Sequence, residues 1–360
     1  MKIMTVLGTR PEIIRLSRVM ERLDELCQHT IVHTGQNFDP QLRDVFFHEL
    51  KLRSPDLHLT AQGSFGQQLS TLLPEMEKLF TKEKPDRLLI LGDTNSGLAA
   101  IIAKRIGIPV FHMEAGNRCF DDRVPEEVNR RIIDHSCDVW LPYTERSRQN
   151  LLREGIAGNR IFVTGNPIYE VIKHYEQDIH QSTILSQLEL TEKNYFLVTM
   201  HRAENVDVEQ RLRDTIQGLE QLSNQYKAPV IISTHPRTRI RMENFGIKNS
   251  NAQLRFLPPF GFIDFVTLEK NALCVLSDSG TVQEECAIFQ VPSITIRDTT
   301  ERPETLEYGC NMLSGTGPST ISLCVKNVLE RKGKGTPPPE YVLDHVSETV
   351  VNLLLGYAFF

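Results

Sequence analysis

Two short apolar runs separated by one helix-length segment constrain the fold of this chain most. Residues 87–91 (RLLIL) and 108–113 (IPVFHM) read as strands buried on both faces, and 98–107 (LAAIIAKRIG) reads as a helix between them. This order predicts two parallel neighbouring strands. Asp93 and Glu114 follow the two runs. We therefore expect both carboxylates at the carboxyl edge of one sheet, where open α/β sheets bind ligands.

The same alternation continues along most of the chain. Further strands are predicted at 2–9, 29–36, 138–144, 160–166, 195–201, 228–236, 253–259, 273–280 and 291–298, with amphipathic helices between most of them. The rhythm breaks near 164–182. We predict two α/β domains of similar size, with a boundary near residues 166–170.

Composition excludes several classes of protein. The net charge of −6 gives no general attraction for nucleic acid, and no apolar run approaches the ~20 residues that span a membrane. The seven cysteines are dispersed, without a CxxC pair or zinc-type spacing, which favours free thiols in a reducing compartment and no metal. The N-terminus reads as a strand rather than a signal peptide, so we expect a cytoplasmic enzyme.

The first candidate motif is GTRPE at residues 8–12. It reads as a strand-to-helix turn, with Pro11 suited to position N1 and Glu12 in the first turn. A plain helix start explains those two residues but not Arg10. A cation at the positive end of a helix dipole indicates that an anion binds there.

Three carboxylates are candidates for acid and base chemistry. Asp93 could merely cap the next helix, whereas Glu114 is a poorer cap because no apolar helical pattern follows it. Glu126 lies at the start of a predicted helix and is spaced for an i,i+4 ion pair with Arg130, so a surface pair is the alternative to a catalytic role.

In the second half, His201 and Arg202 follow a predicted strand, and His235 follows the next one with ordinary loop packing as the simpler explanation. The small residues Ser279, Gly280 and Thr281 precede a helix, where backbone amides can hold an anion; the alternative is a capping box from Thr281 to Glu284. Arg297 and Arg302 lie near another strand end. Neither a dinucleotide fingerprint nor a P-loop is present.

Taken together, these motifs resemble the non-hydrolysing UDP-N-acetylglucosamine 2-epimerases. The segments that carry the resemblance, in order, are GTRPE, LGDTNS, MEAGNR, PEEVNR, TGNP, HRAEN, DSGTVQEE and RDTTERPE. The resemblance implies a glycosyltransferase-B-like pair of Rossmann-like domains, 1–168 with a C-terminal helix at 342–360 and 169–341, with a nucleotide-sugar cleft between them. It also implies a homodimer and no cofactor.

The resemblance implies C2 epimerisation of a UDP-2-acetamido sugar for surface polysaccharide synthesis, such as capsule or O-antigen. UDP is eliminated to give a 2-acetamidoglycal and is then added back. The implied catalytic residues are Asp93, Glu114, Glu126 and His201. The implied substrate-binding residues are Arg10, Arg15, Ser279, Gly280, Thr281 and Arg302, with Glu285 on the ribose and Phe265 beside the uracil.

Some segments depart from the better-known bacterial enzymes. Arg15 stands where a lysine is usual, Asn37 where a histidine is usual, and GSFGQQL at 63–69 lacks an arginine that helps to bind an activating second substrate. Allosteric activation is therefore not expected. GTRPEIIRLS, MEAGNRCFDDRVPEE and GNPIYEV are more similar to the branch that forms UDP-N-acetyl-L-fucosamine from UDP-2-acetamido-2,6-dideoxy-L-talose, so both this sugar and UDP-N-acetylglucosamine stay open as substrates.

Three rival functions also stay open. A hydrolysing epimerase would release free N-acetylmannosamine, and a glycosyltransferase of the same architecture would need an acceptor. A regulatory module would bind the nucleotide sugar without turnover. The clustered carboxylates favour proton transfer at carbon over the last two.

Overall fold

The structure is a computed structural model that describes residues 1–36, 40–331, 333 and 335–357, with only the backbone of 40–44. The chain divides into two compact units. The first contains Met1–His174 and Pro339–Phe360, and the second contains Tyr175–Pro338. The sequence-based boundaries lie a few residues away, because helix α7 (Ile168–His174) buries Ile168 and Val171 and packs against the first helix of the first unit.

The first unit is built on a parallel sheet with strand order β3-β2-β1-β4-β5-β6. Its strands are β1 (Lys2–Leu7), β2 (Gln28–His33), β3 (Leu57–His58), β4 (Arg87–Leu91), β5 (Val110–Met113) and β6 (Val139–Leu141). This is a Rossmann-like order, in which the chain starts at the centre, builds one half and then the other. The switch point lies between β1 and β4, and β4 pairs in parallel with β5 as predicted.

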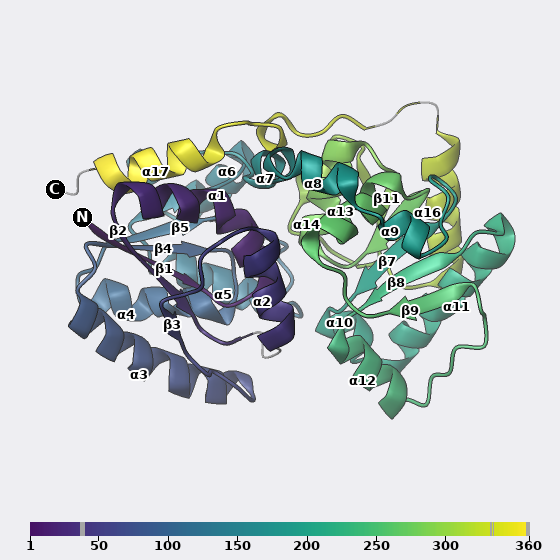
Figure 1. Ribbon diagram of the computed structural model, residues 1–360, viewed down its shortest axis with the longest axis horizontal. Helices are drawn as coiled ribbons and strands as arrows, with labels where there is room; N and C mark the ends of the chain where they lie inside the picture. The colour runs from purple at the N-terminus through teal and green to yellow at the C-terminus, as the bar shows by residue number, and fades with distance from the viewer. Residues whose placement is uncertain (37–39, 332, 334, 358–360) are drawn as a thin grey trace. The chain divides into compact units, whose positions relative to one another are not determined.

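Helices cover both faces of this sheet. They are α1 (Arg10–Leu26), α2 (Pro40–Glu49), α3 (Phe65–Glu83), η1 (Asn95–Leu98), α4 (Ala99–Arg105), α5 (Pro125–Asp134), α6 (Glu145–Arg153), η2 (Gly158–Arg160), α7, η3 (Pro339–Tyr341) and α17 (Val346–Gly356). Helix α1 buries Ile13, Leu16, Met20 and Leu23, a spacing of three and four that places them on one face. The C-terminal α17 lies beside α1 (Figure 1), although more than 300 residues separate them.

The second unit repeats the same topology, with strand order β12-β11-β10-β7-β8-β9. Its strands are β7 (Phe196–Met200), β8 (Val230–Thr234), β9 (Leu254–Leu257), β10 (Cys274–Ser277), β11 (Ser293–Thr295) and β12 (Asn311–Leu313). Its helices are α8 (Glu176–Gln181), α9 (Ile184–Gln187), α10 (Ala203–Val206), α11 (Glu209–Tyr226), α12 (Pro236–Asn244), α13 (Phe262–Asn271), α14 (Gly280–Phe289), α15 (Pro303–Glu307) and α16 (Pro318–Glu330). Its switch point lies between β7 and β10. The prediction of two α/β domains is confirmed.

Some local predictions were wrong. Residues 160–166 do not form a regular strand: Ile161 makes an isolated bridge to Trp140, and the amides of Phe162 and Thr164 donate to the carbonyls of Trp140 and Pro142. Pro11 occupies the second helical position rather than the first, because Thr9 is the N-cap and α1 already begins at Arg10. The long helix α3 and the two-residue edge strand β3 were not predicted.

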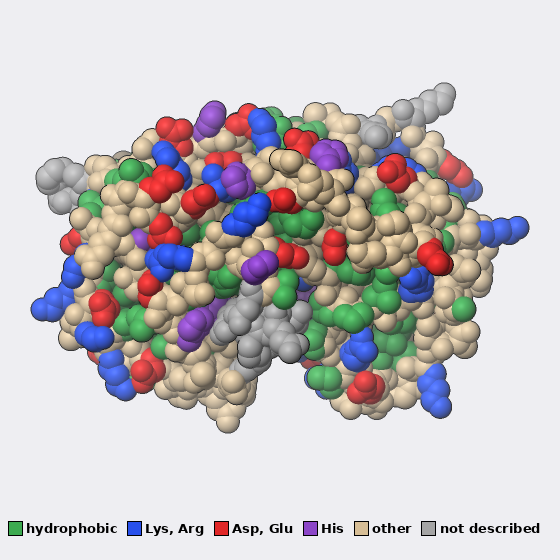
Figure 2. Space-filling view, viewed as in Figure 1, with side chains coloured by type: hydrophobic (Ala, Val, Ile, Leu, Met, Phe, Trp, Pro, Cys, Tyr) green, Lys and Arg blue, Asp and Glu red, His purple; other side chains and the backbone are tan. Residues whose placement is uncertain are grey.

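The core of each unit is apolar and its surface is mixed in charge. In the first unit, Met4 and Val6 of β1 and Leu88 and Ile90 of β4 pack on side chains of α3 and α4. On the face drawn in Figure 2, acidic and basic side chains are interspersed over both units. All seven cysteines are free thiols, as predicted. Among the described residues, no helix combines the length and apolar character needed to cross a membrane.

Candidate active site

In the first unit, Asp93 and Glu114 follow neighbouring parallel strands, as predicted. Leu91 of β4 pairs with Met113 of β5, so the two carboxylates begin from adjacent strand ends. Glu114 has a φ of 65°, in the left-handed region that a glutamate adopts only when its surroundings impose it. Its amide donates to the carbonyl of Leu141 on β6, at 3.1 Å. Strained backbone of this kind concentrates at functional sites.

Arg15 contacts Glu114 directly. Its Nη1 lies 2.8 Å from Oε2 of Glu114, and the two side chains are 2% and 10% exposed. The guanidinium also lies over the ring of Tyr143, 5.7 Å from its centroid. Arg15 is thus fixed by a carboxylate and an aromatic face, which a lysine would not match because it lacks the planar fork. Arg15, which was predicted to bind substrate, is thus the ionic partner of Glu114, which was predicted to act as an acid or base.

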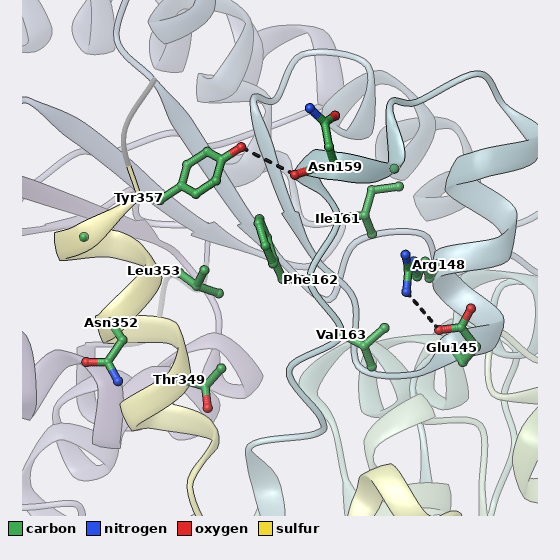
Figure 3. A pocket seen from close by; sticks show the side chains of 12 residues that line it. Glu145, Arg148, Asn159, Ile161, Phe162, Val163, Thr349, Asn352, Leu353 and Tyr357 are labelled. Carbon is green, nitrogen blue, oxygen red and sulfur yellow. Dashed lines mark hydrogen bonds and ion pairs between the residues drawn. The ribbon is translucent and has the colours of Figure 1, made fainter. Parts of the chain in front are cut away.

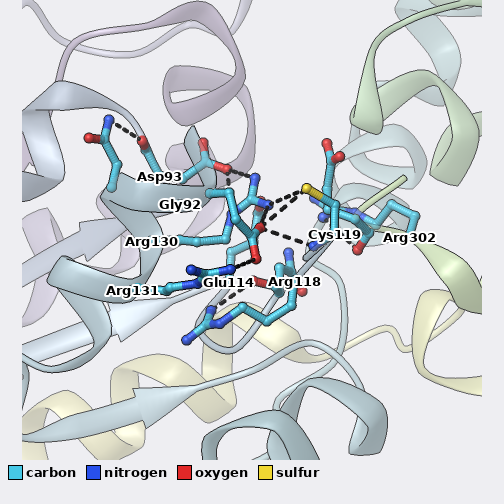
Figure 4. A network of polar contacts seen from close by, with 12 residues as sticks. Gly92, Asp93, Glu114, Arg118, Cys119, Arg130, Arg131 and Arg302 are labelled. Atoms are coloured by element: carbon cyan, nitrogen blue, oxygen red, sulfur yellow. Dashed lines mark hydrogen bonds and ion pairs between the residues drawn. The ribbon is translucent and has the colours of Figure 1, made fainter. Parts of the chain in front are cut away.

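Asp93 belongs to a second ion-pair network, shown in Figure 4. Its Oδ2 accepts from Arg130, whose Nη1 in turn lies 2.7 Å from Oε2 of the fully buried Glu127. The alternative that Asp93 merely caps the next helix is not what the structure shows. Thr94 is the N-cap of η1, and the Asp93 carboxylate instead faces Arg130 on α5.

Glu126 and Glu127 occupy the first turn of α5, as predicted, but they differ in burial. Glu126 is half-buried, whereas Glu127 is enclosed and accepts from the amides of Cys119 and Phe120, both at 3.0 Å. Burial alone would raise the pKa of Glu127, but these hydrogen bonds and the charge of Arg130 hold it below its usual range. Glu127 therefore anchors the 119–120 turn, and Glu126 is the more accessible of the two carboxylates.

Glu12 was treated in the sequence only as a residue of the first helical turn, and the structure gives it a larger part. Its carboxylate accepts from the amides of Gly8 and Thr9 and from the hydroxyls of Thr9 and Thr94, at 2.7 to 3.0 Å. It thereby joins the ends of β1 and β4 at the switch point. Its complete burial raises its pKa to about 7 despite the four donors. The sequence signal was its position three residues after Thr9.

Other predicted contacts of this unit lie beside the same loops. Arg10, at the first position of α1, lies over the ring of Phe46 at 5.2 Å from the centroid, and its binding of an anion stays a prediction. Asn37 lies outside the described residues. Gln67 is used in the start of α3, where its Oε1 accepts from the amide of Ser64 at 2.8 Å.

In the second unit, His201 lies at the end of β7 and is held by Asp278. The buried Asp278 carboxylate accepts from the amides of His201 and Arg202 at 2.9 to 3.0 Å, and one oxygen lies 3.3 Å from Nδ1 of His201. The imidazole is 34% exposed, so it is oriented yet accessible. His235 is the N-cap of α12, and its ring lies 5.6 Å from that of His201. Asp278 was overlooked, although it follows a strand as Asp93 does.

The small-residue turn begins α14. Ser279 is the N-cap and Gly280 the first helical residue, and no side chain satisfies the first amides of this helix among the described contacts. A side chain at position 280 would place its Cβ 2.5 Å from Oε1 of Glu301, so the Glu301 carboxylate would have to move to admit it. The expected capping box from Thr281 to Glu284 is wrong, because the helix begins before Thr281 and Glu284 instead pairs with Arg302.

Arg302 is only 3% exposed, and its Nε donates to the buried Glu284. A guanidinium enclosed against a carboxylate is neutralised, so Arg302 has a structural contact that the sequence did not predict. Its contact with a diphosphate stays a prediction. Arg297 is likewise buried and pairs with Glu301 at 2.8 Å.

Glu285 and Phe265 lie where α14 and α13 pack. Burial and the adjacent Glu285 charge raise the pKa of Glu269 well above its usual range. Phe265 is 7% exposed and packs in the apolar core with Leu197 and Leu268. The ring therefore has little free surface, and its contact with uracil is not supported by its burial.

A groove of about 840 Å³ lies elsewhere in the first unit, along α17 and the residues after β6. Figure 3 shows the side chains that line it, among them Arg148, Ile161, Phe162, Leu353 and Tyr357. Within the described part of the chain, its lining includes none of the predicted site residues. The candidate site is therefore defined by the strand ends rather than by this groove. The described residues also contain no cluster of three or more acidic, histidine or cysteine side chains fit for a metal.

Comparison with known proteins gives a consistent result. A family model described as UDP-N-acetylglucosamine 2-epimerase matches residues 21–355. The UDP-N-acetylglucosamine 2-epimerase of Methanocaldococcus jannaschii is 41% identical over 342 residues, covering 92% of this chain and 93% of the relative. The UDP-2,3-diacetamido-2,3-dideoxy-D-glucuronate 2-epimerase of Pseudomonas aeruginosa is 36% identical, covering 89% and 90%.

Solved structures agree. The crystal structure of the Methanocaldococcus jannaschii enzyme in complex with UDP-GlcNAc and UDP superposes with a TM-score of 0.94, at 39% identity and 99% coverage of both chains. A spinosyn rhamnosyltransferase, at 11% identity and a TM-score of 0.57, shares the fold alone, which confirms the expected glycosyltransferase-B-like architecture of two Rossmann-like domains. The chain belongs to the UDP-N-acetylglucosamine 2-epimerase family.

Proposed function

We propose that this isomerase inverts C2 of a UDP-2-acetamido sugar without hydrolysing it. The observation that carries the proposal is the pair Asp93 and Glu114 on neighbouring strand ends, each held by a buried arginine. Removal of a weakly acidic hydrogen from carbon needs a fixed base, and return of a hydrogen to the opposite face needs a fixed acid. The bound UDP-GlcNAc and UDP in the Methanocaldococcus jannaschii structure support this class of substrate.

The reaction has two halves. In the first, a carboxylate takes the C2 hydrogen while the C1–O bond to UDP breaks, which gives a 2-acetamidoglycal and UDP. In the second, UDP adds back to C1 and an acid delivers hydrogen to the other face of C2. Asp93, Glu114 and Glu126 are the proposed acid and base residues. No redox change occurs, so no nicotinamide is needed.

The second unit is proposed to hold the leaving UDP. The first amides of α14, at Gly280 and Thr281, meet a helix dipole that favours anions, and Asp278 orients the accessible imidazole of His201. Glu285 is the proposed acceptor for ribose hydroxyls. UDP must stay bound between the two halves, because its release would leave a free glycal.

The deciding experiment is proton NMR of substrate incubated with enzyme in deuterated water. UDP-N-acetylglucosamine and UDP-2-acetamido-2,6-dideoxy-L-talose are tested separately. The expected product is the C2 epimer still joined to UDP, with deuterium at C2. Free N-acetylmannosamine would instead indicate a hydrolysing epimerase, and transfer only with an added acceptor would indicate a glycosyltransferase. An epimer that keeps the original hydrogen at C2 would contradict the mechanism.

We also propose that the enzyme works as a homodimer in the cytoplasm. The seven free thiols suit a reducing compartment. Light scattering at several protein concentrations tests the assembly, for which a constant monomer mass would be the opposing result.

A further inference from the structure

A buried histidine lies beneath the two candidate carboxylates. His112, in β5, is 1% exposed and comes two residues before Glu114. Its Nε2 lies 2.8 Å from the carbonyl oxygen of Gly92, the residue before Asp93. Its Nδ1 lies 2.9 Å from Oδ1 of Asp134. One imidazole therefore connects the strand that carries Glu114 with the turn that carries Asp93.

Both ring nitrogens of His112 face acceptors. A backbone carbonyl has no hydrogen to give, and an ionised carboxylate has none either. A neutral imidazole carries one N–H and would leave one of these short contacts without a hydrogen. Only the imidazolium form donates to Gly92 and Asp134 together.

The charges around the ring also favour a hydrogen on both nitrogens of His112. Asp134 is fully buried, and its other oxygen accepts from the amide of Gly116 at 3.1 Å and lies 2.8 Å from Nη1 of Arg118. Arg118 also pairs with Glu154, at 2.6 Å. With His112 positive, the charges of these four side chains sum to zero. A neutral ring would leave a net charge of −1 shared with Glu154, whose side chain is 26% exposed and lies 3.5 Å from His135. Burial opposes ionisation of Asp134, but the hydrogen bond and charge of His112, followed by those of Arg118, lower its pKa overall.

Other contacts also hold this turn: the side-chain amide of Asn129 donates to the Asp93 carbonyl at 3.1 Å, and Arg130 pairs with the Asp93 carboxylate. Gly92 has a φ of 72°, and its amide donates to the carbonyl of Met113 at 3.0 Å. A Cβ placed on Gly92 would lie 3.9 Å from the carboxyl group of Glu114, so this turn lies against the second carboxylate. His112 contacts the Gly92 carbonyl, and this hydrogen bond acts with the others to set the direction of the Gly92–Asp93 peptide.

We propose that His112 is a positioning residue, held as an imidazolium between Asp134 and the Gly92 carbonyl, that fixes Asp93 relative to Glu114 for hydrogen transfer at C2. It does not touch substrate. The catalytic part of this inference rests on the proposed function, whereas the two-donor state of the ring does not.

Two variants separate the two hydrogen bonds. His112→Gln places an amide nitrogen near the position of Nε2 and keeps a donor for Gly92. His112→Asn places one near Nδ1 and keeps a donor for Asp134 but not for Gly92. Both remove the ring and its charge, so each is the control for the other. We expect kcat to fall about 10- to 100-fold further in the Asn variant than in the Gln variant, because a misplacement of about 1 Å has effects of that size. The dissociation constant of UDP should stay within about threefold in both.

A purely structural role for His112 would make the two kcat losses equal at equal folded fraction, and that result would overturn the proposal. The second measurement uses the intact wild-type protein and so does not depend on the folding of either variant. Nitrogen-15 NMR at pH 7 should show hydrogen on both nitrogens of His112. A ring with hydrogen on only one nitrogen would also overturn the proposal. If wild-type enzyme lacked epimerase activity while both ring nitrogens carried hydrogen, the proposed function would fail and the two-donor assignment would stand.

Discussion

The two units have the same arrangement at their switch points but carry different functional groups there. In each unit a buried carboxylate joins the two central strand ends: Glu12 accepts from residues after β1 and β4, and Asp278, directly after β10, accepts from amides after β7. Burial raises the pKa of both carboxylic acids. Near its buried carboxylate the first unit carries Asp93 and Glu114. The second unit instead carries the His201 imidazole, the small residues 279–281 and the first amides of α14. The fold thus fixes where groups are displayed, and the residue after each strand decides their chemistry.

The largest expected effect tests whether the carboxylates of the first unit carry out the hydrogen transfer. Glu114→Gln keeps the shape but removes hydrogen transfer, a contribution of about 10²–10⁴ in rate, and should leave UDP affinity within a few fold. Steady-state kinetics and UDP titration measure the two quantities. Glu145→Gln, an exposed carboxylate of the same unit, is the control and should change neither. Normal turnover with lost UDP affinity would reverse the roles assigned to the two units.

The next effect concerns the arginine buried in the second unit. Arg302→Ala leaves Glu284 as an enclosed, uncompensated charge, which destabilises a protein by about 3–5 kcal/mol. Chemical denaturation should show this loss without any ligand. The double variant Arg302→Met, Glu284→Gln removes both charges and should recover much of the stability. A stable single variant with weak UDP binding would instead make Arg302 a ligand-binding residue.

The stability of the protein should depend on pH through the buried Glu12 of the first unit. Glu12 has a folded pKa of about 7, above its usual value of 4.5. Because the folded state binds this hydrogen more tightly, its contribution to stability is complete below pH 4.5 and is lost as pH rises through 7, by roughly 3 kcal/mol in all. Unfolding followed from pH 4 to 8 should show this component in the wild type and not in Glu12→Gln. If stability changed with pH in the same way in the wild type and in Glu12→Gln, the raised pKa would not belong to Glu12.

Arg10 tests whether phosphate binding belongs to the second unit alone, because it is a cation at a helix start in the first unit. If it binds the diphosphate, Arg10→Ala should weaken UDP by about 1.5–3 kcal/mol and leave uridine nearly unchanged. Isothermal titration with both ligands measures the difference. Equal losses for UDP and uridine would indicate damage to the fold or to base recognition, and phosphate binding would then belong to the second unit alone.

The smallest expected effect is on activation. A second substrate molecule stimulates an enzyme only if it binds one conformational state better than another. Residues 63–69 supply no arginine, and Gln67 is used to begin α3. Rate should therefore depend hyperbolically on substrate, and catalytic amounts of UDP-N-acetylglucosamine should not stimulate the reverse reaction. A sigmoidal curve that is abolished by changing Gln36 or Gln67 would contradict this expectation.

The sequence by itself determined the alternation of strands and helices, the pairing of the strands before Asp93 and Glu114, and the family. These follow from local periodicity and from residues that stand at fixed places after a strand. It missed α3, whose apolar face is interrupted by Pro74 and begins in a polar segment. It also predicted a strand at 160–166, a segment that lies beside β6 but pairs with it only through the Ile161 bridge and two backbone hydrogen bonds.

Only the tertiary structure decided which charged and polar groups contact one another. Arg15 with Glu114, Arg130 with Asp93, Arg302 with Glu284 and His112 with Gly92 each join residues from different elements. Linear spacing gives no information on such contacts. It left open an i,i+4 pair from Glu126 to Arg130, and the structure pairs Arg130 with Asp93 and Glu127. Burial likewise depends on the packed state, so neither the near-neutral pKa of Glu12 nor the enclosure of Phe265 and Arg302 was visible before the chain was folded.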